Sequence, residues 1–210
     1  MFAVIFDMDG VLVDNYHFHK RAFAEYFSQY GITLTPAMLG RGNEDLMAEL
    51  FPNENKQRHQ ELAAGKEAYY RQIYQPHIKP VAGLVELLQD LKRNNILIAV
   101  GSSGPEENIN FVLDQLKIRN YFDVVVSAAM VQKAKPAPDI YLKSAELLNS
   151  EPENCLVFED ALAGIHAALA AKMKVIGITT SLPKEKLVET NKIINDFTEI
   201  TVAEIKQIIT

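Results

Sequence analysis

Short apolar runs that alternate with amphipathic segments of helix length constrain the fold of this chain most. The five apolar runs lie at residues 2–6, 96–100, 123–127, 155–158 and 174–178. Each of the last four follows a segment with helical periodicity, at 81–94, 106–117, 137–149 and 161–172. Strands that alternate with helices form parallel sheets through right-handed crossovers, and such strands are buried on both sides. The alternation predicts an α/β fold, a Rossmann-like parallel sheet with helices on both faces.

One long stretch breaks the alternation. Between residues 15 and 79 no segment resembles a strand, and the pattern predicts helices at 15–30, around 43–50 and at 54–74. Glycine and proline residues separate these segments, as expected at helix ends. We therefore expect a core domain made of residues 1–14 and 80–210, with an α-helical cap domain inserted at residues 15–79.

Composition narrows the functional classes. Of the 210 residues 48% are apolar and 23% are charged, which is typical of a globular protein, and the net charge is −6. A net-negative chain is a poor general binder of nucleic acid or of acidic lipid. A basic segment before the first apolar run is missing, as is a run of about 18 apolar residues. Cys155 is the single cysteine and cannot form an internal disulfide, which fits a reducing compartment. We therefore expect a cytoplasmic monomer that binds neither nucleic acid nor membranes.

Polar residues follow the predicted strands where a ligand would be expected. In open parallel sheets, ligands bind beyond the carboxyl ends of the strands. The residues at those positions are Asp7 and Asp9 after the first strand, Gly101, Ser102 and Ser103 after the second, Lys135 beyond the third, and Glu159 with Asp160 after the fourth. Taken singly, each group has a structural explanation as a turn, a helix cap or a solvated lysine. Together they predict one polar site.

The chemistry of these groups favours phosphoryl transfer. Four converging carboxylates repel one another unless a cation or protons compensate them, and oxygen ligands favour Mg²⁺. A hydroxyl-containing loop and Lys135 suit a phosphoryl group. An Asp carboxylate can attack phosphorus as a nucleophile, while a second Asp two residues later transfers protons.

Four motifs carry a family resemblance. They are FDMDGVLVD (6–14), IAVGSS (98–103), KPAPDIY (135–141) and VFEDALAGI (157–165). In this order and spacing the chain resembles the haloacid dehalogenase-like (HAD) phosphohydrolase superfamily along its whole length. It looks most like the β-phosphoglucomutase-like branch, which has a helical cap between the first and second motifs.

The resemblance implies a role for each core residue. Asp7 resembles the nucleophile that becomes an aspartyl phosphate, and Asp9 resembles the general acid/base. Ser102 looks like the phosphate-binding hydroxyl, and Lys135 like the lysine that balances the charge of the nucleophile and the phosphate. Gly10 and Ser103 join the expected phosphate site.

The resemblance also implies a Mg²⁺ cofactor. Its expected ligands are the side chains of Asp7, Glu159 and Asp160 and the backbone carbonyl of Asp9. Family members with haloacid or phosphonate chemistry lack the second Asp, so the presence of Asp9 points to phosphate esters.

The cap offers weaker matches. His19, Gly40 and Lys66 match positions that contact substrate or control closure in the mutases, although His19 and Lys66 also have a structural explanation as ordinary helix residues. Asn43 stands where the mutases place an arginine, and Arg41 lies two residues earlier. A phosphate-binding arginine is not easily replaced. This departure argues against a bisphosphate mutase.

We therefore expect a Mg²⁺-dependent phosphatase that acts through Asp7 on a small phosphorylated metabolite, such as a sugar phosphate. The alternative within the family is β-phosphoglucomutase, because the two activities differ only in the acceptor. An aspartate-phosphorylated signalling receiver is an alternative of another class. In receivers, however, the phosphoacceptor ends the third strand, and about 120 residues without a cap are enough. A catalytically idle binding protein is disfavoured by the intact core residues.

Overall fold

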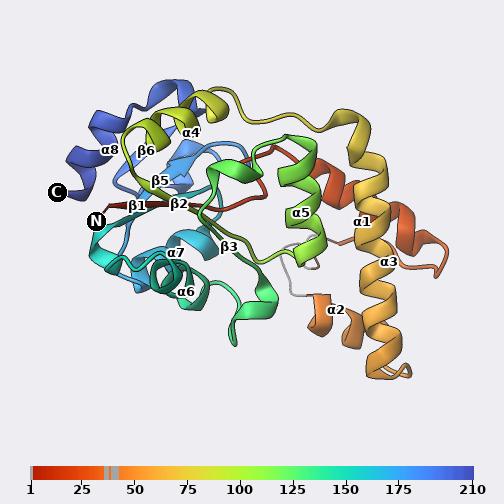
Figure 1. Cartoon of the computed structure of the whole chain (residues 1–210). Coiled ribbons are helices and arrows are strands. Elements are labelled where there is room, and N and C mark those ends of the chain that lie inside the picture. The colour runs from red at the N-terminus through yellow and green to blue at the C-terminus, as the bar shows by residue number, and fades with distance from the viewer. Residues whose placement is uncertain (1, 36–37, 39–42) are drawn as a thin grey trace. The chain divides into compact units, whose positions relative to one another are not determined.

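The computed structural model describes residues 2–35, 38 and 43–210 (Figure 1). The backbone divides into two compact units, Met1–Asp14 with Lys79–Thr210, and Asn15–Ile78. The first unit is an α/β unit and the second is helical. Each is described separately.

A six-stranded parallel sheet forms the centre of the α/β unit. Its strands are β1 (Ala3–Phe6), β2 (Leu97–Gly101), β3 (Val124–Val126), β4 (Cys155–Glu159), β5 (Lys174–Ile178) and β6 (Lys192–Ile194). The order across the sheet is β3-β2-β1-β4-β5-β6. Ile5 pairs with Ala99 of β2 on one side and with Val157 of β4 on the other. The chain adds strands first on one side of β1 and then on the other, which makes the end of β1 the topological switch point where ligands bind in such sheets.

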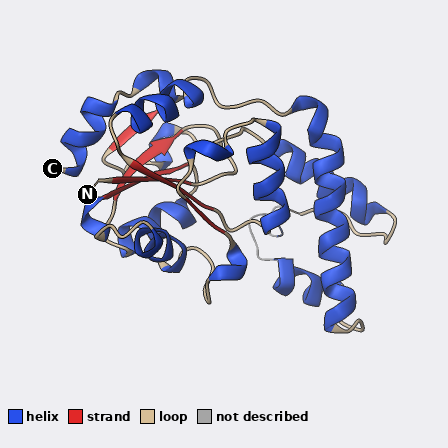
Figure 2. Cartoon of the chain, viewed as in Figure 1, coloured by secondary structure: helices blue, strands red, loops and turns tan. Residues whose placement is uncertain are grey.

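Helices cover both faces of this sheet (Figure 2). The helices α4 (Leu84–Arg93) and α8 (Val202–Ile209) lie on one face, and α6 (Asp139–Leu147) and α7 (Leu162–Ala170) lie on the other. The fifth helix of the unit, α5 (Glu106–Gln115), follows β2. In α4 the leucines that recur at helical spacing are the buried ones, Leu84, Leu87, Leu88 and Leu91. The predicted Rossmann-like α/β fold is confirmed.

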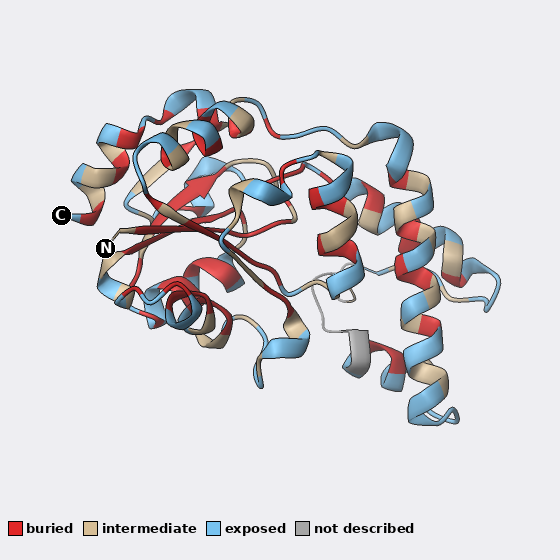
Figure 3. Ribbon diagram, in the orientation of Figure 1, coloured by how far each residue is buried: buried red, intermediate tan, exposed pale blue. Residues whose placement is uncertain are grey.

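The structure adds detail that the apolar runs did not predict. All four residues of β1 are buried, as expected for a central strand (Figure 3). Gly101 and Glu159, expected just beyond their strands, are the last residues of β2 and β4. The strand β6 and the helix α8 were not predicted. Because β6 has three residues and only Ile194 among them is buried, it lacks the apolar pattern of the other strands.

The helical unit contains α1 (Tyr16–Ser28), α2 (Asn43–Leu50) and α3 (Lys56–Tyr74). The helix α3 packs against both others around a core of Phe23, Phe27, Leu46, Met47 and Leu62. Asn55 caps α3 by accepting a hydrogen bond from the Arg58 backbone N–H. In the described part of the chain, no helix combines the length and apolarity needed to cross a bilayer.

Candidate active site

The carboxyl end of β1 carries the first acidic residue of the candidate site. The Asp7 backbone N–H donates to the Phe158 carbonyl over 3.1 Å, which extends the pairing of β1 with β4 beyond the strand. The chain then turns tightly: the Gly10 N–H donates to the Val13 carbonyl over 2.7 Å, and Gly10 has a φ of +80°. Glycine adopts such a positive φ at a lower energetic cost than other residues. The turn keeps Asp7 at the switch point of the sheet.

Lys135 connects two carboxylates from neighbouring strands. Its Nζ donates to Oδ1 of Asp7 over 2.7 Å and to Oε1 of Glu159 over 2.6 Å. The side chain is 9% exposed, so water screens these ion pairs weakly. The ammonium also lies 4.8 Å from the centre of the Tyr141 ring. A residue 128 positions from Asp7 in sequence therefore holds the first and fourth strand ends together.

The carboxylate of Glu159 accepts four hydrogen bonds. Its Oε1 accepts from Lys135 and, over 2.6 Å, from the Tyr141 hydroxyl. Its Oε2 accepts from the backbone N–H groups of Asp160 and Ala161 over 2.9 and 3.1 Å. The Cα of Gly164 lies so close that an added Cβ would be 1.6 Å from Oε1. Four donors and a glycine therefore fix Glu159.

Asp160 is held from a different direction. Ser181, in the loop after β5, donates its hydroxyl to Oδ2 of Asp160. Gly10 faces the same oxygen, because a Cβ on Gly10 would lie 1.8 Å from it. The neighbouring Thr180 donates its hydroxyl to the Gly10 carbonyl. A fifth strand end thus joins the four that the sequence indicated.

Burial controls the protonation of these carboxyls. It raises the pKa of Asp7 to about 7, with Glu159 and Asp9 adding to the shift and Lys135 opposing it. Burial, together with the charges of Glu159 and Asp7, also raises the pKa of Asp160 well above its ordinary value. Burial opposes ionisation of Glu159 too, but the charge and hydrogen bond of Lys135, together with the hydrogen bonds from Tyr141 and the Ala161 backbone, outweigh it and lower the pKa of Glu159. Asp7 and Asp160 therefore have too little positive charge around them to favour their ionised forms.

The donor set suits a hard divalent cation. Asp7, Glu159 and Asp160 each offer a carboxylate oxygen, and these atoms lie within 4.8 Å of one another. Three carboxylates and the Lys135 ammonium carry a net charge of minus two when ionised, which a divalent cation would cancel. Carboxylate oxygens are the ligands that Mg²⁺ prefers. Because Glu159 already accepts four hydrogen bonds, Asp7 and Asp160 have the more available oxygens.

The second strand end contributes a hydroxyl beside this cluster. Ser102 is buried, and its Oγ accepts a hydrogen bond from the Gly104 N–H over 3.0 Å. A Cβ on Gly104 would lie 3.2 Å from Oγ of Ser102 and 3.7 Å from Oδ2 of Asp9, so both side chains lie next to Gly104. Ser103 is exposed on the same loop. The structure thus places Asp9 and Ser102 near each other, as the sequence suggested.

The remaining predicted residues belong to the helical unit. The ring of His19 stacks on that of Tyr70, with centroids 3.8 Å apart. Lys66 is buried in α3 and pairs with Glu67. Asn43 begins α2. Gly40 and Arg41 lie outside the described residues.

The sequence interpretation missed several residues that shape the site. They are Tyr141, Gly164, Thr180 and Ser181. Tyr141 and Gly164 belong to the quoted motifs but were assigned no role. The hydroxyls of Thr180 and Ser181 follow the predicted strand at 174–178, so the rule applied to the other four strand ends would have found them.

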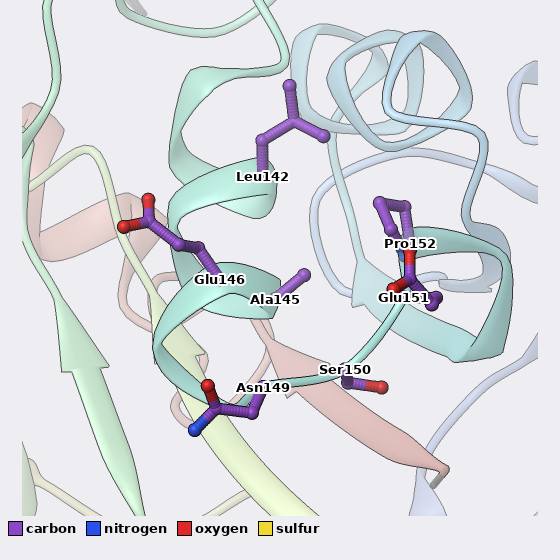
Figure 4. Close-up of a pocket in the computed structure, with 7 residues that line it drawn as sticks. All are labelled: Leu142, Ala145, Glu146, Asn149, Ser150, Glu151 and Pro152. Carbon is purple, nitrogen blue, oxygen red and sulfur yellow. The ribbon is translucent and has the colours of Figure 1, made fainter.

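A surface hollow of about 420 Å³ lies beside the amino end of β4 (Figure 4). It is lined by the end of α6 and the segment that leads into β4, including Leu142, Glu146 and Pro152. The carboxyl end of β4 carries Glu159, whereas this hollow adjoins the amino end of the same strand. It is therefore separate from the acidic cluster.

Comparison with known proteins agrees with this geometry. A model of the haloacid dehalogenase-like hydrolase family matches residues 4–178. The chain is 32% identical to validoxylamine A 7′-phosphate phosphatase from Streptomyces hygroscopicus subsp. limoneus, over 94% of this chain and 95% of that protein. It is 33% identical to a phosphorylated carbohydrates phosphatase from Thermotoga maritima, over 87% of each.

The fold is shared with a solved structure as well. A crystal structure of β-phosphoglucomutase from Clostridium difficile matches with a TM-score of 0.86 and 29% identity, over 100% of this chain and 97% of that one. Together with the match of the family model, these similarities show that the chain belongs to the haloacid dehalogenase-like hydrolase family and is an enzyme of its phosphatase and phosphotransferase type.

Proposed function

We propose that this protein is a Mg²⁺-dependent phosphatase of small phosphorylated metabolites such as sugar phosphates. The observation that carries the proposal is the pairing of Asp7 with Lys135 beside two further carboxylates, at the switch point of the sheet. Two relatives whose names state phosphatase activity, one of them toward phosphorylated carbohydrates, support the reaction class.

In this proposal Asp7 is the nucleophile. Its carboxylate oxygen attacks phosphorus, the bond from phosphorus to the ester oxygen breaks, and Asp9 gives its proton to the leaving alcohol. Asp9 then accepts a proton from a water molecule that attacks the phosphorus of the aspartyl phosphate. Inorganic phosphate leaves, and Asp7 is free again. Lys135, at 2.7 Å from Asp7, balances negative charge throughout.

The side chains of Asp7, Glu159 and Asp160 and the Asp9 carbonyl would hold Mg²⁺. When bound, the ion neutralises charge on the phosphoryl group. Ser102, Ser103 and Gly10 would contact the phosphate through hydroxyl and backbone groups. The predicted cap residues His19, Gly40, Asn43 and Lys66 would select the substrate, with the helical unit acting as the cap. The proposal also includes a monomer in the cytoplasm; the single cysteine, Cys155, is free and fits a reducing compartment.

A second candidate is a β-phosphoglucomutase-like activity, which the similarity to the Clostridium difficile enzyme supports. A mutase must protect its aspartyl phosphate from water until a sugar hydroxyl arrives. Asn43 stands where the family resemblance places a phosphate-binding arginine, so the phosphatase is the better-supported activity.

A panel of phosphorylated metabolites, assayed for released phosphate with Mg²⁺ and with EDTA, tests the proposal. We expect release that requires Mg²⁺ and is abolished in Asp7→Asn. Full activity in EDTA would contradict the metal requirement. Rapid conversion of β-glucose 1-phosphate to glucose 6-phosphate without phosphate release, primed by the 1,6-bisphosphate, would favour the mutase.

A further inference from the structure

The two adjacent carboxylates at the end of β4 are supported very differently. Glu159 accepts hydrogen bonds from two side chains and two backbone N–H groups. Among the described residues, the side-chain hydrogen bond to Asp160 comes from the hydroxyl of Ser181. Asp160 is only 4% exposed, so water contributes little to fixing its orientation. The direction of the Asp160 carboxylate therefore depends on Ser181.

Ser181 and Gly10 enclose the same oxygen of Asp160. A Cβ on Gly10 would lie 1.8 Å from Oδ2 of Asp160 and 3.0 Å from Oγ of Ser181. With Oδ2 held in this way, Oδ1 is the oxygen left for a cation. Rotation of the carboxylate away from this orientation would break the hydrogen bond from Ser181.

The segment that leads to Ser181 is anchored to neighbouring parts of the structure. The preceding strand β5 pairs with β4, with Gly177 opposite Glu159. Thr180 donates its hydroxyl to the Gly10 carbonyl. The Thr179 backbone N–H donates to the Ile194 carbonyl over 3.1 Å. Ser181 is thus presented to Asp160 by a fixed backbone.

We propose that Ser181 is a positioning residue that orients Asp160 for binding of the divalent cation. This inference rests on the proposed Mg²⁺ site of the phosphatase. Groups that hydrogen-bond to metal ligands fix their orientation, and losing one typically weakens metal binding by about 10- to 100-fold.

The test compares Mg²⁺ affinity, measured by calorimetric titration, in the unmodified full-length protein and in Ser181→Ala. We expect the dissociation constant for Mg²⁺ to rise about 10-fold or more in Ser181→Ala. Ser181→Thr keeps the hydroxyl and should bind Mg²⁺ nearly as the unmodified protein does. Phosphatase activity of Ser181→Ala should be lowest at low Mg²⁺ and should recover as Mg²⁺ is raised.

Thr179→Val is the matched control. It removes a hydroxyl from the same loop, two residues away, but that hydroxyl contacts Asn195 instead of Asp160. Its Mg²⁺ affinity should equal that of the unmodified protein. Equal Mg²⁺ affinity in Ser181→Ala and the unmodified protein would overturn the proposal, as would an equal loss in Thr179→Val.

These readouts separate the role of Ser181 from the proposed function. If the unmodified protein bound Mg²⁺ but hydrolysed no phosphate ester, the phosphatase would be refuted, while the affinities would still decide the role of Ser181. The melting temperature of each variant in EDTA establishes that it is folded. If Ser181→Ala failed this check, Ser181→Cys, whose thiol is a weak donor, would replace it with the same expected loss.

Discussion

For the replacement of Gly164 by alanine, the geometry of this site and the general helix propensities predict opposite changes in stability. Gly164 lies in the first turn of α7, and glycine in a helix is less favourable than alanine by roughly 0.5–1 kcal/mol. Helix propensity alone therefore predicts that Gly164→Ala is stabilising. The structure predicts the opposite sign.

The reason is the position of the Glu159 carboxylate. A Cβ at Gly164 would lie 1.6 Å from Oε1 of Glu159 and 2.0 Å from its Cδ, whereas real Cβ atoms essentially never approach within 3.0 Å. Glu159 is 1% exposed and cannot move into solvent. Its retreat would break the 2.6 Å hydrogen bonds from Lys135 and Tyr141.

The magnitude follows from those two bonds. Hydrogen bonds to charged groups contribute about 1.5–3 kcal/mol each, so losing two outweighs the gain in helix propensity. We expect Gly164→Ala to lower the free energy of unfolding by about 3 kcal/mol, which corresponds to a melting temperature lower by roughly 6–12 °C for a chain of this size.

The assay is urea and thermal unfolding in EDTA, so that metal binding does not contribute. Ala163→Gly is the control, because Ala163 is the exposed neighbour in the same helix. It should cost about 0.5–1 kcal/mol, the difference in helix propensity. A Gly164→Ala protein as stable as the unmodified one, or more stable, would refute the placement of Glu159 against this helix.

Two further predictions concern protonation and the second aspartate. Because burial raises the pKa of Asp7 to about 7 and raises that of Asp160, the folded metal-free protein binds more protons than the unfolded chain between about pH 5 and pH 7. The melting temperature of the protein in EDTA should therefore fall as pH rises through this range. Added Mg²⁺ should stabilise the protein more at pH 8 than at pH 5. A melting temperature that rises with pH in EDTA would contradict this prediction. Asp9→Asn should lower kcat by roughly 10²-fold or more, through loss of acid/base chemistry, and yet keep Mg²⁺ affinity close to that of the unmodified protein. Loss of Mg²⁺ binding in Asp9→Asn would show that its side chain is a ligand.

The architecture was predictable because it rests on strong local patterns. A central strand such as β1 is uniformly apolar and buried, and the helices between the strands have clear periodicity. The helix α8 also had a readable signal, since Thr201 and Glu204 form a capping box before a periodic apolar segment. Strand β6 had no such signal, because it is short and only partly buried.

The site was predictable in location but not in its contacts. Strand ends of a parallel sheet meet at one edge, so Asp7, Lys135 and Glu159 were expected near one another. Sequence could not show that Lys135 bridges the other two, or that Glu159 takes four donors, because these depend on side-chain packing across 128 and 24 positions. The clash between Gly164 and Glu159 is likewise visible only in three dimensions.

The central claim is that Asp7 carries the phosphoryl group. It is tested most directly by mixing the enzyme with Mg²⁺ and a phosphorylated metabolite that it hydrolyses, quenching during the first turnover, and reducing with borohydride, which converts an aspartyl phosphate to homoserine. Mass spectrometry of the peptides should find homoserine at position 7 and unmodified Asp at position 9, with no reduction in Asp7→Asn. Homoserine at position 9 or 160, or first-turnover phosphate release with no trapped acyl phosphate at position 7, would contradict the account.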